Sequence, residues 1–271
     1  MQPKLVSMLP KRLNEAALPT PFVEELLALT TNHTTGSLAS GDCTVVRSPF
    51  VEDALGAVGN GTEADVDEAF RIARSAQKDW AAKPVAERVK AMEQFHKSVV
   101  KRQDLLADLV QLETGKDRTA AFDEVLDVLN NARYYANNAA GFLSTKRRAG
   151  AFPVITSTRE QRFPKGVVGQ ISPWNYPLAL GVSDAIPALL AGNAVVAKPD
   201  STTPFSAIIA KKLLTNAGLP KDLFQIVTGS GKVVGQAIAQ QCDYLMFTGS
   251  TATGKLLGKV VGERLVGYSA E

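Results

Sequence analysis

From residue 166 onward, short apolar runs alternate with longer segments of helical periodicity. The apolar runs predict strands at 166–172, 193–198, 223–228, 244–248 and 265–270. The segments between them predict helices at about 178–191, 203–217, 232–240 and 252–262. Parallel strands buried on both faces have continuous apolar sequences, and their helical crossovers are right-handed. The pattern therefore predicts an α/β fold with a Rossmann-like, doubly wound parallel sheet over 166–271.

Residues 1–142 instead predict a strand and helices that pack on this sheet. A short helix is expected near Phe22–Leu29, before a polar loop from Thr30 to Gly41 and a strand at 43–51, and Gly56, Gly59 and Gly61 indicate turns. Thr62 and Asp65 resemble a capping box at the start of the first long helix. Apolar spacing predicts three further helices, over Val85–Arg102, Asp104–Glu113 and Ala120–Phe142.

Residues 143–165 differ from both neighbouring regions. Val154 to Phe163 alternates loosely between apolar and polar residues, which predicts an exposed hairpin arm. The basic triplet Lys146-Arg147-Arg148 precedes it and is interpreted as a solvated turn, because short charge runs usually lie at the surface.

Composition narrows the class of protein. Of the 271 residues 45% are hydrophobic and 21% charged, which is typical of a folded core, and the net charge of +3 does not favour nucleic acid or membrane partners. Cys43 and Cys242 lie far apart in the sequence and do not have the spacing of metal ligands. A disulfide framework is therefore not expected, which fits a reducing compartment. No signal peptide is evident, and Asp184 and Asn193 interrupt the apolar run at 177–197. We expect a cytoplasmic protein.

Several loops follow predicted strands at the edge where open α/β sheets bind ligands. Pro173-Trp174-Asn175-Tyr176-Pro177 follows the first strand. The glycine clusters at 229–235 and 249–254 each follow a strand and open a helix, where backbone N–H groups can bind phosphate. Alternatively these glycines only permit tight turns. Lys198 ends the second strand and either contacts a ribose or phosphate or lies at the surface.

Six of these segments resemble the aldehyde dehydrogenase superfamily in order and spacing. They are ETGK at 113–116, PWNYP at 173–177, PALLAGNAVVAKP at 187–199, AGLPKDLFQIVTG at 217–229, FTGSTATG at 247–254 and the terminal SAE. The resemblance runs from about Gly59 to the end and covers that family's N-terminal half. Within the family, KGVVGQISPWNYP, AGNAVVAKPDS and CDYLMFTGS look most like the NADP-dependent succinate-semialdehyde dehydrogenases.

The resemblance implies oxidation of an aldehyde, here succinate semialdehyde, to its carboxylic acid with NAD(P)+. Asn175 matches the donor to the oxyanion and Glu271 the general base. The resemblance also implies that nine residues bind the cofactor, namely Ser172, Pro173, Trp174, Lys198, Ser201, Gly231, Gly235, Gly249 and Ser250. Ser201 stands where NAD-preferring members often have an acid that would repel a 2′-phosphate, so we expect NADP, with NAD as the alternative.

The family's nucleophilic cysteine lies downstream of these motifs, and neither Cys43 nor Cys242 matches it. We therefore expect that the catalytic domain is absent from this chain, and that the 271 residues alone are inactive. The alternative hypothesis is a truncated, non-catalytic nucleotide-binding fragment. Residues 143–165 resemble the arm that joins subunits in the family, which implies a homo-oligomer for the full-length form.

Overall fold

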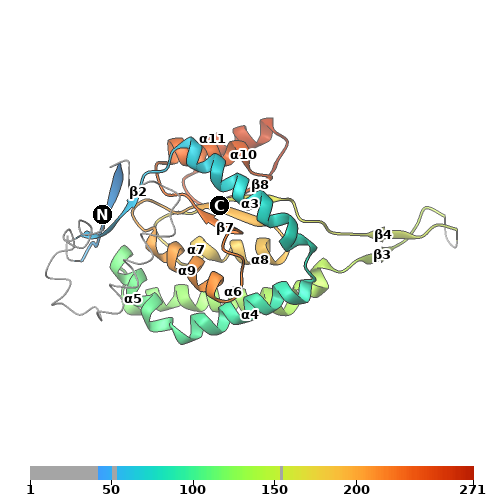
Figure 1. Cartoon of the computed structure of the whole chain (residues 1–271), viewed down its shortest axis with the longest axis horizontal. Helices are drawn as coiled ribbons and strands as arrows, with labels where there is room; N and C mark the ends of the chain where they lie inside the picture. Colours follow the sequence, from blue (N-terminus) through green and yellow to red (C-terminus); the bar gives the residue numbers. More distant parts are fainter. Residues whose placement is uncertain (1–41, 51–53, 153–154) are drawn as a thin grey trace.

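The computed structural model describes residues 42–50, 54–152 and 155–271, in which helices flank both faces of a five-stranded sheet (Figure 1). The helix expected near Phe22–Leu29 and the loop from Thr30 to Gly41 lie outside the described residues. A hairpin of two short strands projects from the body.

The central sheet contains the five strands that the apolar runs predicted. They are β5 (Val167–Ile171), β6 (Ala194–Lys198), β7 (Phe224–Ile226), β8 (Tyr244–Phe247) and β9 (Gly267–Ala270). All neighbours are parallel, in the order β7-β6-β5-β8-β9. The order reverses at β5, so the crevice at its carboxyl end is the switch point of a doubly wound sheet. The predicted fold class is confirmed.

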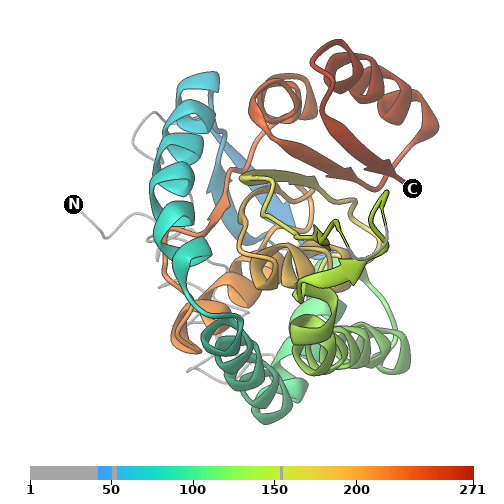
Figure 2. The same ribbon diagram turned by 90° about the vertical axis from the view of Figure 1, so that its right-hand side faces the viewer.

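Helices cover both faces of this sheet, as the end-on view in Figure 2 shows. Helices α3 (Glu63–Ala82) and α10 (Gln236–Gln241) pack against one face. Helices α8 (Ala185–Leu190) and α9 (Phe205–Asn216) pack against the other, with α7 (Ala179–Val182) beside α9. A Cβ atom at Gly169 would lie 2.6 Å from the Ile238 side chain, so this glycine allows α10 to approach the central strand closely.

A further layer of helices packs outside α7, α8 and α9. It consists of α4 (Val85–Lys101), α5 (Gln103–Thr114) and α6 (Arg118–Leu143). The predicted capping box of α3 is confirmed, since Thr62 and Asp65 exchange both hydrogen bonds. Helix α5 ends where Gly115 adopts a left-handed conformation with φ of 78°, which a glycine adopts without strain.

The turns expected at Gly56 and Gly59 are wrong. Residues Ala54–Gly59 form strand β2, which pairs antiparallel with β1 (Cys43–Arg47). The glycine at 56 is needed for packing, because a Cβ atom there would lie 2.9 Å from the Phe205 ring. The strand expected at 43–51 is correspondingly shorter, and its last position lies outside the described residues.

Two expected helices also differ from the structure. The segment 178–191 is divided into α7 and α8 because Pro187 lacks the N–H that would bond to the carbonyl of Ser183. The segment 232–240 begins with a π-helical turn, η3 (Gly231–Gly235), before α10. The last predicted helix is confirmed as α11 (Thr251–Glu263).

The projecting hairpin consists of β3 (Lys146–Arg148) and β4 (Thr158–Glu160), paired antiparallel. The basic triplet expected in a turn is thus the strand β3, although all three side chains are exposed as expected. Arg148 and Glu160 form an ion pair of 2.6 Å across the hairpin. The exposed hairpin predicted within 143–165 is confirmed.

Candidate functional site

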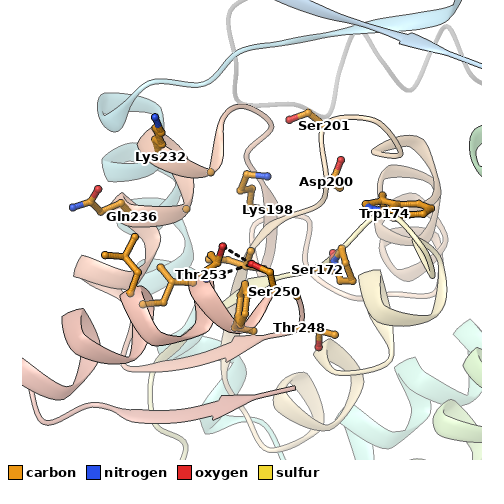
Figure 3. Close-up of a pocket in the computed structure, with 18 of the residues that line it drawn as sticks. Ser172, Trp174, Lys198, Asp200, Ser201, Lys232, Gln236, Thr248, Ser250 and Thr253 are labelled. Carbon is orange, nitrogen blue, oxygen red and sulfur yellow. Dashed lines mark hydrogen bonds between the residues drawn. The ribbon is translucent and has the colours of Figure 1, made fainter.

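A pocket of about 880 Å³ opens at the carboxyl ends of β5, β6 and β8, at the switch point of the sheet (Figure 3). Its floor and walls come from segments far apart in the sequence: the loop after β5, the loop after β6, η3, and the loop before α11. Glu271, which follows β9, also lines it.

All eleven residues that the sequence predicted for catalysis or cofactor binding line this one pocket. They are Ser172, Pro173, Trp174, Asn175, Lys198, Ser201, Gly231, Gly235, Gly249, Ser250 and Glu271. The structure thus brings these residues together. Their roles in binding and catalysis stay predictions. Eleven positions spread over a hundred residues meet because parallel strands all end at the same edge.

The loop after β6 carries the predicted ribose contacts. The Lys198 side chain is buried, and its Nζ donates to the Pro199 carbonyl at 3.1 Å. Burial lowers the pKa of this amine, while the nearby Asp200 carboxylate acts in the opposite direction. The surface position considered for Lys198 is therefore wrong. Asp200 accepts from the N–H and hydroxyl of Thr202 at 2.9 and 2.7 Å, which closes a local turn.

Two glycine-containing turns form further parts of the pocket wall. Gly235 lies on the pocket floor, where an added Cβ atom would meet Ile171 at 3.7 Å and the Lys198 stem at 3.8 Å. Ser250 begins α11, and its hydroxyl accepts from the Thr253 N–H at 3.3 Å. This 13-residue helix directs its N-terminus toward the pocket, where its dipole favours an anion.

Asn175 lies exposed in the loop between β5 and α7, and a buried carboxylate fixes the end of that loop. Glu124 of α6 accepts from the N–H groups of Leu178 and Ala179 at 2.9 and 3.1 Å. Lys116 forms an ion pair of 2.6 Å with Glu124, and its Nζ also lies 3.6 Å from the centroid of the Tyr176 ring. The loop is thus held at its backbone and at one of its aromatic side chains.

A second buried carboxylate fixes the loop that carries Lys198. No side chain from within that loop caps α9. Instead, Glu113 of α5 accepts from the N–H of Phe205 at 2.6 Å and from the N–H of Ser206 at 2.8 Å. Burial raises the pKa of Glu113 to about 7, against the effect of these donors.

Glu271 is exposed beside the loop before α11. Its backbone pairs with that loop, since its N–H donates to Phe247 and its carbonyl accepts from Gly249, both at 3.0 Å. Burial raises the pKa of Asp184, and the Glu271 and Asp127 carboxylates add to this effect. Asp184 is therefore within electrostatic range of the Glu271 carboxylate.

Neither cysteine of the sequence lines the pocket. Cys43 is exposed on β1, and Cys242 is buried between α10 and β8, as expected of a structural thiol. Burial raises the pKa of the Cys242 thiol, which disfavours the thiolate. The pocket therefore contains no thiol nucleophile from these 271 residues.

The structure adds pocket residues beyond the eleven predicted positions. Most come from η3, α10 and α11, namely Lys232, Gln236, Thr253, Leu256, Leu257 and Val260. Helical spacing from Gly231 and Ser250 could have suggested them. The contacts of Glu113 and Glu124 could not be found this way, because they join residues 54 to 93 positions apart.

No helix in the described part of the chain has both the length and the apolar character to cross a membrane.

Comparison with known proteins identifies relatives of about twice this length. A putative succinate-semialdehyde dehydrogenase (NADP+) from Mycolicibacterium smegmatis is 54% identical over 226 residues, which cover 83% of this chain and 44% of the relative. A putative succinate-semialdehyde dehydrogenase (NADP+) 2 from Mycobacterium tuberculosis is 46% identical over 254 residues, 94% of this chain and 49% of that protein. The chain thus spans about half the length of the curated relatives it matches.

Solved structures of similar fold and sequence are also found. An NADP-dependent enzyme of E. coli is 31% identical with a TM-score of 0.82, and the match covers 86% of this chain and 48% of the enzyme. Betaine aldehyde dehydrogenase from Staphylococcus aureus in complex with NAD+ is 26% identical with a TM-score of 0.83, over 92% of this chain and 52% of that one. The model of the aldehyde dehydrogenase family matches residues 38–271, so the chain belongs to that family.

Proposed function

We propose that this chain is the cofactor-binding half of an NADP-dependent dehydrogenase that oxidises an aldehyde to a carboxylic acid. The observation that supports it best is the single pocket that gathers Lys198, Asn175 and Glu271 at the switch point of the sheet. The names of the relatives favour succinate semialdehyde as the aldehyde, and NADP+ as the cofactor.

The pocket fits a dinucleotide. Gly231 has nothing within 4 Å of an added Cβ position and Gly235 lies on the floor, so the backbone leaves room where a ligand must approach closely. Apolar side chains of α11, Leu257 and Val260, offer a surface for a flat base. Lys198 and Ser201 would hold the adenosine ribose, and the turn at Gly249 and Ser250 would hold the pyrophosphate.

The bound cofactor would supply the hydride acceptor. The chain's own residues would stabilise the developing charge and transfer the proton. The Asn175 side chain would donate its N–H to the oxygen on which negative charge develops, a contribution worth about 3 kcal/mol for one such donor. Glu271 would act as the general base that takes a proton from water or a thiol.

The remaining parts of the proposal concern the whole protein. We assign residues 1–142 to a strand and helices that pack on the cofactor region, 143–165 to an arm that joins subunits, and 166–271 to the cofactor region itself. Since neither cysteine lines the pocket, the nucleophile would come from outside these residues. The free cysteines fit a cytoplasmic location.

A chimera tests this function. The chain would replace the matching part of the M. smegmatis relative, with that relative assayed in parallel and the 271-residue chain assayed alone. We expect NADPH formation with succinate semialdehyde from the chimera and none from the chain alone. Asn175→Ala in the chimera should lower kcat by about 10²- to 10³-fold. A folded chimera that binds NADP+ without oxidising any aldehyde would favour the alternative, a non-catalytic nucleotide-binding protein.

A further inference from the structure

We propose that Lys232 recognises the 2′-phosphate of NADP and sets the preference for NADP over NAD. The inference rests on the proposed function, because it assigns a residue of the same pocket. The sequence motifs point only to Lys198 and Ser201 at this end of the cofactor.

Lys232 lies in the π-helical turn that forms one wall of the pocket. Its neighbours on that turn, Gly235 and Gln236, also line the pocket, as expected for positions three and four residues further on. The Gly235 position lies against the Lys198 stem, 3.8 Å from its Cδ atom. Lys232 therefore lies on the same turn as the residue that adjoins the Lys198 stem, and both lysines line the pocket.

A hydrogen bond joins the two segments that carry these lysines. The Ser201 hydroxyl donates to the Gly229 carbonyl at 3.0 Å, which ties the loop after β6 to the start of the turn. Figure 3 shows Lys198 between Lys232 and Gln236 on one side and Asp200 and Ser201 on the other. A 2′-phosphate on a ribose held by Lys198 would thus lie in a pocket that both lysines line.

The partners of these groups single out Lys232. Lys198 is buried and donates to Pro199, the Ser201 hydroxyl is engaged with Gly229, and Asp200 adds a negative charge. The Lys232 side chain is exposed, and it makes no hydrogen bond or ion pair with another side chain or backbone group of the described residues. Of the described residues that line the pocket, only Lys198 and Lys232 are cationic, against Asp200 and Glu271.

These charges predict different needs for the two cofactors. A 2′-phosphate brings up to two negative charges close to Asp200, and one buried lysine does not compensate for both. NAD has a neutral hydroxyl at that position and gains nothing from a second cation. Loss of the Lys232 charge should therefore weaken NADP binding and leave NAD binding nearly unchanged.

The experiment is a fluorescence titration of the full 271-residue chain with NADP+ and with NAD+. Trp174 is 58% exposed and lines the pocket, whereas Trp80 is 3% exposed, so quenching on binding reports on the site. The variants are Lys232→Gln, the charge-conserving Lys232→Arg, and Lys221→Gln as a control at an exposed lysine away from the pocket. Thermal unfolding of each variant confirms that it is folded.

We expect Lys232→Gln to raise the Kd for NADP+ about tenfold and to change the Kd for NAD+ less than about twofold. Lys232→Arg and Lys221→Gln should retain the wild-type ratio. Equal loss for both cofactors, or no loss, in a folded Lys232→Gln variant would refute this inference and leave the proposed function intact. Absence of binding of either cofactor to the wild-type chain would refute both.

Discussion

Glu113→Gln tests whether burial or hydrogen bonding determines the pKa of the Glu113 carboxyl at the start of α9. Glu113 accepts three hydrogen bonds, from the N–H groups of Phe205 and Ser206 and from the Ser206 hydroxyl. These donors and the helix N-terminus favour the ionised carboxylate. Burial disfavours it, and the resulting pKa of about 7 lies above the ordinary value of 4.5, so the structure indicates that burial prevails.

The magnitude follows from linkage between protonation and folding. A carboxyl with a raised pKa in the folded state stabilises the fold fully below pH 4.5, and this contribution is lost as the pH rises through 7. Between pH 5 and pH 8.5 the loss amounts to about 2.5 kcal/mol. Glutamine does not titrate, so the variant lacks this loss.

Urea unfolding of the wild type and of Glu113→Gln, at pH 5 and at pH 8.5, measures the effect. The free energy of unfolding of the wild type minus that of the variant should be about 2.5 kcal/mol smaller at pH 8.5 than at pH 5. Glu263→Gln, at an exposed position of α11, controls for the removal of one carboxylate. A difference that stays constant or grows with pH would show that the three donors prevail, and would refute the reasoning.

Two further variants test buried charges elsewhere in the described chain. Lys116→Met should lower the free energy of urea unfolding by about 3–5 kcal/mol, because Glu124 is left without its cation. Adding Glu124→Gln should recover part of that loss. Additive losses from the two substitutions would contradict the ion pair. Lys211 is buried, and burial lowers its pKa to about 8. The charged amine therefore destabilises the fold below pH 8, and this penalty is absent above pH 10.5. The free energy of unfolding of Lys211→Met, relative to that of the wild type, should be up to about 3 kcal/mol larger at pH 7 than at pH 10.5. An equal difference at both pH values would show that the amine reaches solvent.

The strands and their parallel arrangement were predictable because a buried parallel sheet imposes continuous apolar runs. Local signals were equally informative where one residue controls a helix end, as Thr62 does. The convergence of the motif residues was also predictable, since each motif follows a strand and the strands end at one edge.

Features that depend on contacts between distant segments were not predictable. Gly56 resembles a turn residue in the sequence, yet it lies in a strand because Phe205 packs against it. Thr203 has the residue type of a helix cap, but Glu113 takes that role from 92 positions away. Lys232 lies in a glycine cluster that the sequence singled out for its backbone, and its side chain draws notice only because the turn that carries it adjoins Lys198.

Calorimetric titration of the chain with NADP+ tests the central claim most directly. Gly235→Val fills the pocket floor beside Ile171 and Lys198, at a position whose φ of −63° accepts a side chain. Gly262→Val is the matched control, at a helical glycine with open space around it. We predict one NADP+ bound per chain, retained in Gly262→Val and weakened at least about tenfold in a folded Gly235→Val by steric overlap. Absence of binding to the wild type, or binding that Gly235→Val leaves unchanged, would contradict the account.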